Sequence, residues 1–440
     1  MGLKHKKGFN IVTKSHKAKL LRDEINFGET KLFFNSVVEF YFGLVDKHPE
    51  GTDVAVNKGG GWRFYEVLTI GEDPKYFIPE SLNKCPSTLR RAAIRIAIGA
   101  WKSWHSNYTR WQHRAKKYKH HRPPVQPRQF NFSLPYDKGM SKNDDGVNQT
   151  IMLKLLINGQ WKWLKFNYQQ YSIDNGWVKG QITIVIKRNQ PYLTYTLEKY
   201  VPATGGSKKV MADHCVRVMA VDIDLDKHAA IVSILETEAN QVREVARHFI
   251  KTPVGVQLRK RDLGTIAQKM RLTGIIDKGF CSSLWSRLSR REIEMGRTIG
   301  RQLAELAHGY NCQLMAFEHL ENLKPIKGKY SRKSNQKRSY WLKSKIFDHA
   351  SRVAYTDYTI LTNRVNPRDT SRVDPWGNLV ARQNNLVDWT DDAYNPGATW
   401  VIGQNDYISH SGINAARNIG LKAIARYRTN PVFIWEQGKA

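Results

Sequence analysis

Two carboxylates stand at the ends of short apolar runs that lie far apart in the sequence. Asp222 follows VMAV (218–221), and Glu318 follows LMAF (314–317). Runs of this kind are typical of buried strands, so each acid is expected at a strand end. Paired carboxylates suit Mg²⁺, and two such ions about 3.5–4 Å apart can activate water and stabilise the leaving oxygen of a phosphodiester. On spacing alone, surface salt bridges at the two strand ends are the commoner explanation.

Further acids follow Asp222 closely. Because side chains alternate along a strand, Asp224 and Asp226 fall on the same face as Asp222. Acids are rarely so dense in a buried strand unless a cation lies nearby. Asp224 is therefore a candidate substitute ligand beside Asp222 and Glu318.

The C-terminal half of the chain has the pattern of an α/β domain. The expected elements are a strand hairpin, a long basic helix, a short strand and two further helices, at 216–235, 282–310, 313–320, 339–361 and 414–427. This alternation of strands and helices predicts a mixed sheet with helices packed against it. In such a sheet, Asp222 and Glu318 are expected to meet at one edge, facing the head of the final helix.

The N-terminal half has a different pattern. A short strand (9–14) is followed by mostly helical spacing and then, over 126–212, by strand-like alternation with turn signals. The second helix begins at Pro86 and carries aromatic residues, Trp101 and Trp104 among them. Their spacing indicates a stripe that faces the core, and base stacking is the alternative.

Four segments of the chain occur in the order found in one family of nucleic-acid enzymes. The matching segments are AVDIDLDKHAA (220–230), AFEHLENLK (316–324), VNPRDTS (365–371) and YISHSGINAARNI (407–419). The ordered set resembles the RuvC-like nuclease domain of transposon-encoded TnpB proteins and compact type V CRISPR effectors. Asp222 and Glu318 take the catalytic places of the first two motifs, and Asp224 stands where the family usually has Gly.

The resemblance implies a fold class and an order of domains. The fold class is α/β and α+β multidomain, with a RuvC-like (RNase H-like) mixed sheet and helices, a β-barrel wedge domain and a helical recognition lobe. The implied parts are a wedge strand, the recognition lobe, the wedge domain, the RuvC-like domain, an insert and the end of the RuvC-like domain, at 1–20, 21–125, 126–212, 213–365, 366–404 and 405–440.

The last motif departs from the family. The family's third catalytic aspartate aligns with Gly412, and Ser409 stands in place of the preceding aspartate. Asp222 and Glu318 are then the remnant of a set of three metal ligands, with Asp224 as the better substitute. We expect weak binding of Mg²⁺ at most, because an ion that has lost one of three carboxylates is held poorly.

No zinc site is expected. The family's zinc ribbon has paired cysteines, whereas the four cysteines of this chain lie far apart and none follows Thr370-Ser371. The segment 366–404 is therefore interpreted as a zinc-ribbon remnant without cysteines, packed on its tryptophans.

The charge of the chain points to a polyanion as partner. The sequence has 70 Lys and Arg against 39 Asp and Glu, a net charge of +31, spread along its whole length. So large a charge repels itself unless phosphates screen it. The residues expected to contact nucleic-acid phosphates are Lys102, Arg110, Arg114, Lys116, Lys117, Arg287, Arg290, Arg291, Lys327, Lys329, Arg332 and Lys333. For each of them, a solvated surface charge is the alternative.

The resemblance implies guide RNA and target double-stranded DNA as partners, with base pairing read next to a short duplex motif. Because the third ligand is missing, the expected function is RNA-guided DNA binding without cleavage. Such a complex acts by transcriptional control or by recruiting a protein partner in transcription or transposition. Two alternatives stay open: an active RNA-guided, Mg²⁺-dependent DNA endonuclease with a rearranged site, and a guide-independent nucleic-acid-binding protein.

No membrane segment is expected. The first residues, MGLKHKKGFNIVTK, lack the apolar run of a signal peptide, and no stretch is long and apolar enough to cross a bilayer. We expect the protein in the prokaryotic cytosol, associated with the nucleoid.

Overall fold

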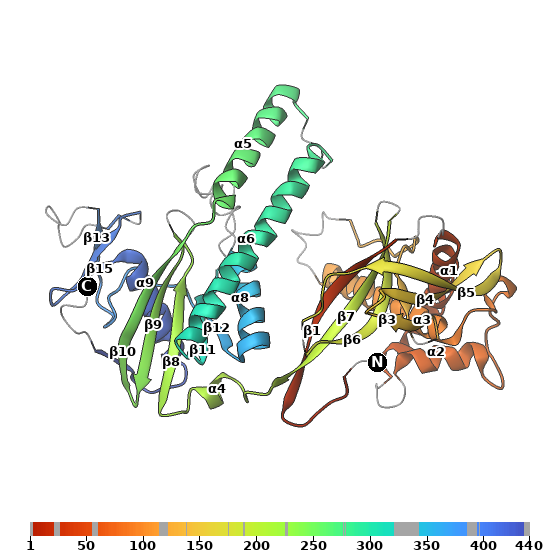
Figure 1. Ribbon diagram of the computed structural model, residues 1–440, viewed down its shortest axis with the longest axis horizontal. Helices are drawn as coiled ribbons and strands as arrows, with labels where there is room; N and C mark the ends of the chain where they lie inside the picture. The colour runs from red at the N-terminus through yellow and green to blue at the C-terminus, as the bar shows by residue number, and fades with distance from the viewer. Residues whose placement is uncertain are drawn as a thin grey trace. The chain divides into compact units, whose positions relative to one another are not determined.

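The computed structural model divides the chain into two compact units, Met1–Lys7 with Ile11–Tyr200 and Gly8–Asn10 with Val201–Ala440. We describe each unit by itself (Figure 1). The described residues are 3–21, 27–54, 60–113, 122–137, 139–174, 176–187, 190–224, 228–275, 277, 279–320, 343–384, 394–395 and 397–434.

One part of unit 1 consists of helices that pack on one another. They are α1 (Gly28–Lys47), the 3₁₀ turn η1 (Pro49–Asp53), α2 (Gly61–Ile70), a second 3₁₀ turn η3 (Glu80–Leu82) and α3 (Ser87–Gln112). The expected helix start at Pro86 is confirmed, because Pro86 directly precedes α3, where its fixed φ suits the entry to a helix. Trp101 is buried and its Nε1 donates to Asp46 Oδ1 at 2.9 Å, so this aromatic residue packs in the core.

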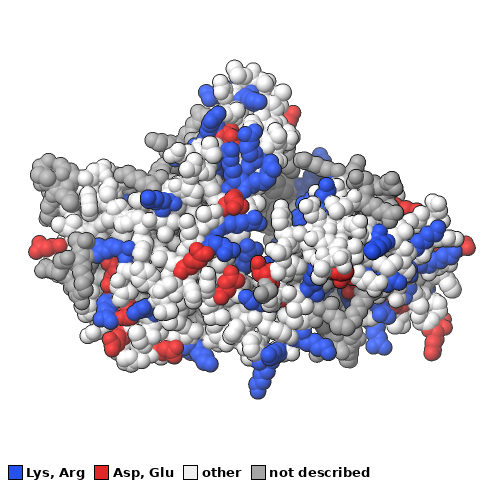
Figure 2. Space-filling view, viewed as in Figure 1, with Lys and Arg blue, Asp and Glu red and all other residues white. Residues whose placement is uncertain are grey.

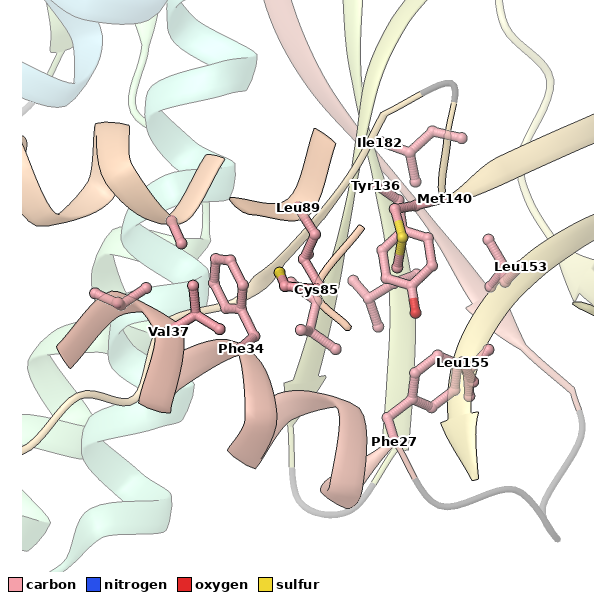
Figure 3. Packing of buried hydrophobic residues seen from close by; sticks show 14 of the residues in the cluster. Phe27, Phe34, Val37, Cys85, Leu89, Tyr136, Met140, Leu153, Leu155 and Ile182 are labelled. Carbon is pink, nitrogen blue, oxygen red and sulfur yellow. The ribbon is translucent and has the colours of Figure 1, made fainter. Parts of the chain in front are cut away.

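A seven-stranded sheet forms the rest of unit 1. Its strands are β1 (Phe9–Leu20), β2 (Leu134–Tyr136), β3 (Ser141–Asp145), β4 (Thr150–Ile157), β5 (Gln160–Gln169), β6 (Val178–Lys187) and β7 (Gln190–Pro202), in the order β2-β6-β7-β1-β5-β4-β3. Strand β1 precedes the helices in sequence yet lies between β7 and β5. Figure 3 shows Phe34 of α1 and Leu89 of α3 in the same apolar core as Tyr136 of β2 and Leu155 of β4. The helices and the sheet therefore share one core.

Unit 2 contains the predicted mixed sheet. Its strands are β8 (Cys215–Asp222), β9 (His228–Glu238), β10 (Gln241–Lys251), β11 (Leu314–Glu318), β12 (Leu361–Val365) and β16 (Val432–Ile434), in the order β12-β11-β8-β9-β10-β16. Strand β9 runs antiparallel to both β8 and β10, whereas β16 lies parallel to β10, β11 lies parallel to β8 and β12 lies parallel to β11. The mixed sheet predicted for this half of the chain is confirmed.

Helices cover both faces of that sheet. Alternate residues of β8 and β11, such as Val221 and Phe317, pack against α6 (Ser282–Gly309) and α8 (Lys343–Tyr358). The intervening residues, such as Ala220 and Ala316, pack against α9 (Ser411–Ala425). Helix α9 comes so close that a Cβ on Gly420 would lie 3.0 Å from the Cβ of Ala220. Gly at position 420 thus allows α9 to pack closely on β8.

Several elements of unit 2 were not predicted. Strand β10 and helix α5 (Gly255–Thr273) follow the predicted hairpin, and α5 pairs with α6 in a helical arm that projects from the sheet (Figure 1). A short helix α4 (Ser207–Val210) precedes β8. The insert contributes a small three-stranded sheet of β13 (Ala381–Gln383), β14 (Trp400–Ile402) and β15 (Ile408–His410). Within the described ranges, no helix has both the length and the apolar character to span a bilayer.

Candidate active site

The structure brings Asp222 and Glu318 together at one edge of the mixed sheet. Parallel strands β8 and β11 are registered through the pair Val221 and Phe317, and each carboxylate is the next residue of its strand. Because side chains alternate, both point to the face that carries Ala220 and Ala316, which is the face that α9 covers. The pairing of the two strands alone therefore places the two carboxylates next to each other, and no turn or loop has to bring them together.

Burial raises the pKa of both carboxyl groups. The pKa of Asp222 is raised well above its usual value by burial first and then by the charges of Glu318 and Asp224, with Arg382 opposing. The pKa of Glu318 is raised by burial, and a hydrogen bond from Thr370 and the charge of Lys422 oppose this. A pair of carboxylates that disfavour their own ionisation favours a bound cation.

Helix α9 positions Thr370 at this pair. The hydroxyl of Thr370 donates to Glu318 Oε1 at 2.5 Å. The Nδ2 amide of Asn418 donates to the carbonyl oxygens of Thr370 (2.9 Å) and Val373 (2.7 Å), and that of Asn414 donates to Val373 O at 2.9 Å. The Asn-Ala-Ala segment therefore fixes the loop that carries the Thr-Ser motif.

Gly412, at which the resemblance predicted the missing third carboxylate, lies against the side chain of Ile231. Gly412 lies in the first turn of α9, where its N–H donates to Nδ1 of His410 at 3.1 Å. A Cβ at Gly412 would lie 2.2 Å from Cδ1 and 3.3 Å from Cγ1 of Ile231. Ile231 is 1% exposed and is the β9 partner of Asp222 in the sheet. An apolar side chain thus fills the space in which a third carboxylate would be built.

The place of the preceding aspartate has a structural role. Ser409 Oγ accepts a hydrogen bond from Nη1 of Arg417 at 2.9 Å. Arg417 is fully buried, pairs with Glu244 of β10 at 2.5 Å and donates to the hydroxyl of Tyr407 at 2.9 Å. Ser233 donates to the same Glu244 carboxylate at 2.7 Å. This network joins α9 to the sheet beside the candidate site.

The insert packs as a turn and a small sheet. Asp374 is fully buried and accepts hydrogen bonds from the backbone N–H groups of Trp376 and Asn378, both at 2.9 Å. The indole of Trp376 contacts the rings of Tyr407 and Phe433 edge-on, with centroids 5.5 and 5.9 Å apart. Tryptophan packing and an aspartate-closed turn thus organise this segment.

The insert also supplies a cation that the sequence did not indicate. Arg382 of β13 donates to Ala398 O at 2.9 Å and to Ser411 Oγ at 3.1 Å, and its charge acts on Asp222. Neither Arg382 nor Ile231 stands in a recognisable motif, so no signal in the sequence could have found them.

Asp224 lies close enough to Asp222 to raise its pKa, while Asp226 lies outside the described residues. Among the residues that the structure describes, no group of three or more His, Cys, Asp or Glu side chains is arranged to hold a metal ion. Asp222 and Glu318 therefore form a pair, with Asp224 as a near neighbour.

The predicted phosphate contacts are only partly described. Arg114, Lys116 and Lys117, together with Lys327, Lys329, Arg332 and Lys333, lie outside the described residues. Lys102 is exposed and pairs with Asp53 at 3.3 Å, and Arg110 is exposed in the last turn of α3.

On α6, Arg287 and Arg290 are exposed, whereas Arg291 is paired with Asp262 of α5 and also donates to Leu258 O at 3.3 Å. Figure 2 shows Lys and Arg side chains gathered along the arm formed by α5 and α6. The arm is therefore a basic surface on which Arg291 has a structural partner.

The chain was compared with protein families, curated proteins and solved structures. A model described as the Aq_aa04 family matches residues 13–157, which is less than half of the chain. A search of curated proteins finds no match.

Solved structures similar to this chain are type V CRISPR effectors. They include a Cas12f1–sgRNA–target DNA complex (16% identity, 93% of this chain and 99% of that chain, TM-score 0.34) and CasPhi-2 (Cas12j) bound to crRNA (11%, 95% and 99%, 0.46). An AacC2c1–sgRNA–extended non-target DNA complex is similar at 10% identity, over 91% of this chain and 64% of that chain, with a TM-score of 0.47.

Proposed function

We propose that this chain is an RNA-guided DNA-binding protein whose RuvC-like domain retains two of three metal ligands and acts by occupying its target. One observation carries the proposal: Asp222 and Glu318 are adjacent, but the third position is Gly412, backed by Ile231. A site with this gap holds catalytic ions poorly. The bound complex then blocks transcription or recruits a protein partner in transcription or transposition.

The partners in this proposal are guide RNA and target double-stranded DNA, as the order of the motifs implies. The net charge of +31 supports them, because a guide and a heteroduplex together present many phosphates. Arg287 and Arg290 on α6 place part of this positive charge on an exposed surface. The helical part of unit 1 as a recognition lobe and its sheet as a wedge domain belong to the same proposal.

The chain's own residues fit a single divalent cation better than a pair. Asp222 and Glu318 would hold Mg²⁺: burial raises the pKa of both carboxyl groups, the charges of Glu318 and Asp224 add to the shift at Asp222, and a bound cation would favour the ionised forms. The methyl groups of Ile231 offer no ligand on the opposite side. Bound there, Mg²⁺ would supply electrostatic stabilisation of a nearby phosphate, and Thr370 would orient Glu318.

A second function has one observation in its favour. Asp224 interacts with Asp222, so a rearranged set of Asp222, Asp224 and Glu318 would make the protein an active Mg²⁺-dependent endonuclease. In the first function the bound target stays intact, whereas in the second these carboxylates support its cleavage.

The experiment uses the ribonucleoprotein with its co-purifying RNA, target DNA and Mg²⁺. The RNA is sequenced, binding is measured by gel shift and cleavage by product length. The proposal expects one defined RNA species, guide-directed binding and no cleavage, and it expects Glu318→Ala to leave binding unchanged. Cleavage abolished by Asp222→Ala and by Asp224→Asn would establish the endonuclease. Heterogeneous RNA and binding that ignores the guide would indicate a guide-independent protein.

A further inference from the structure

A basic cavity lies beside the carboxylate pair, at the end of β12. It has a volume of about 420 Å³ and is lined by Val365, Asn366, Arg368, Asp369, Lys422 and Arg426. Val365 is the β12 partner of Glu318 in the sheet, so the cavity begins one strand away from that carboxylate. Its lining has three cationic side chains, one carboxylate and a single apolar residue, which suits an anionic ligand.

The three cations come from two different elements. Lys422 lies in the last turn of α9 and Arg426 is its C-cap, where positive charge offsets the partial negative charge of the helix end. Arg368 belongs to the loop after β12, and the helix end does not account for it. It is exposed, and its Nε pairs with Asp369 at 3.3 Å. The convergence of Arg368 with the two α9 residues points to a ligand with negative charge.

Lys422 is held in place before any ligand arrives. Its ammonium donates to the carbonyl oxygen of Arg368 and, at 3.5 Å, to that of Asn366. The same loop is tightened by the N–H of Arg368, which donates to Asn366 Oδ1 at 3.0 Å. Asp369 has a φ of +62°, a left-handed conformation that side-chain-bearing residues rarely adopt. The loop is therefore built around the lysine, and its cation has a fixed position.

We propose that this cavity binds a phosphodiester group of a nucleic-acid strand as the strand passes Glu318. The inference rests on the proposed function, because it assumes that a nucleic-acid strand binds here and places one of its phosphodiester groups next to Asp222 and Glu318. A cavity of this size accommodates more than a bare phosphate. Arg368 and Arg426 are both exposed at its rim, so a continuous strand can enter and leave. Cations at this place also offset the repulsion between a phosphate and Glu318.

The test compares two doubly neutralised variants of the full chain. Arg368→Gln/Arg426→Gln removes two cations from the cavity. Arg297→Gln/Arg301→Gln is the matched control, because both arginines are largely exposed on α6, which covers the opposite face of the sheet. Binding of fluorescein-labelled single-stranded DNA and single-stranded RNA of one sequence is followed by anisotropy over a series of salt concentrations.

The cavity variant is expected to weaken binding about tenfold near 0.1 M salt and to reduce the slope of log Kd against log salt by about 1 for each lost contact. The control is expected to change the affinity by less than about twofold. A loss of affinity for DNA alone, for RNA alone or for both supports phosphodiester binding in the cavity and shows which nucleic acid binds there. Unchanged affinity of the cavity variant, or an equal loss in the control variant, overturns the proposal.

Failure of the proposed function gives a separate result. It appears in the unmodified protein, as heterogeneous co-purifying RNA and binding that does not follow the guide. The cavity variant is then still judged by its own oligonucleotide measurements. Thermal unfolding of both variants confirms that they are folded, and Lys422→Met, which removes the third cation without adding a polar group, is expected to repeat the loss.

Discussion

The carboxylates of Asp222 and Glu318 lie side by side because each is the residue directly after the registered pair Val221 and Phe317 on parallel strands. Their position follows from the backbone of the sheet and not from a flexible loop. Each side chain faces α9, and each has a raised pKa. Ionisation of the pair is therefore opposed by burial and, at Asp222, by the neighbouring carboxylates, and this cost can be measured.

Asp222→Asn is expected to stabilise the protein at neutral pH in the absence of divalent cations. The folded pKa of Asp222 lies above its unfolded value near 4, so the folded state binds its proton more tightly. This contribution is present at pH 4 and is lost as the pH rises through the folded pKa. A gain on the order of 1 kcal/mol would raise the Tm by about 2–4 °C at pH 8, with no gain at pH 4.

Thermal unfolding at several pH values in a chelating buffer measures this effect. Glu294→Gln is the control, because its side chain is 71% exposed, and no change in Tm is expected at any pH. A lower Tm for Asp222→Asn at pH 8 would show that the repulsion is already neutralised within the protein.

Mg²⁺ is expected to bind the wild-type pair weakly. Because an ion that binds only the folded state stabilises it, the Tm should rise with Mg²⁺ in the millimolar range. Asp222→Asn/Glu318→Gln should remove this dependence, and Glu294→Gln should keep it. Isothermal titration calorimetry provides an independent measurement, and a double variant that still responds to Mg²⁺ would place the ion elsewhere.

Gly412→Asp alone is expected to destabilise the protein, because its Cβ would lie 2.2 Å from Cδ1 of the buried Ile231. Overpacking of this kind costs about 1–3 kcal/mol. Ile231→Ala/Gly412→Asp creates the missing space and carboxylate, and should bind Mg²⁺ at least about tenfold more tightly than the wild type. Ile231→Ala alone is the control. The steric argument is wrong if Gly412→Asp by itself is fully stable and gains the same affinity.

Loss of the buried cation of α9 is expected to be among the most damaging changes in unit 2. Arg417→Met leaves the buried Glu244 with Ser233 and, at 3.5 Å, Arg247 as its remaining partners, so the cost is expected near the lower end of about 3–5 kcal/mol. Arg301→Gln, from an exposed pair with Glu305, should cost less than about 1 kcal/mol. Urea unfolding compares the two. Arg417→Met/Glu244→Gln should recover part of the loss, and no recovery would mean that packing, not charge, is decisive.

Arg287→Gln/Arg290→Gln on the helical arm is expected to weaken RNA binding and to lower the salt slope by about 2. Arg291→Gln should have a smaller effect on binding and a larger one on stability, because Arg291 is paired with Asp262. Filter binding and thermal unfolding of the same preparations separate the two effects. Equal losses of RNA binding for Arg287→Gln and Arg291→Gln would contradict this division.

The sequence predicted the local elements of the fold but not the long-range contacts between them. The apolar runs before Asp222 and Glu318 predicted buried strands, and the alternation of strands with helices predicted the mixed sheet. Helix α5 was missed although Leu263, Ile266 and Met270 have helical spacing, because the charged run Arg259–Asp262 interrupts the apolar pattern. Strand β10 was missed because charged residues likewise interrupt its apolar pattern.

The candidate site was predictable only where a motif marks it. The sequence marked Gly412, because the family motif has an aspartate at that place. What this difference does to the site depends on Ile231 of β9, which lies far earlier in the sequence. Arg382 reaches the site through the insert, whose small sheet has no family pattern to follow. Contacts of this kind arise from tertiary packing, and no local periodicity encodes them.

Helix α9 also sets a limit on how this unit can form during synthesis. One face of β8 and β11, with Ala220 and Ala316, packs against α9, whose residues are added about 200 positions after β8. While the ribosome is still making the intervening segments, that apolar face has no covering helix from its own chain. A nascent chain paused before residue 411 should therefore depend on chaperones, and release from that dependence should coincide with emergence of α9.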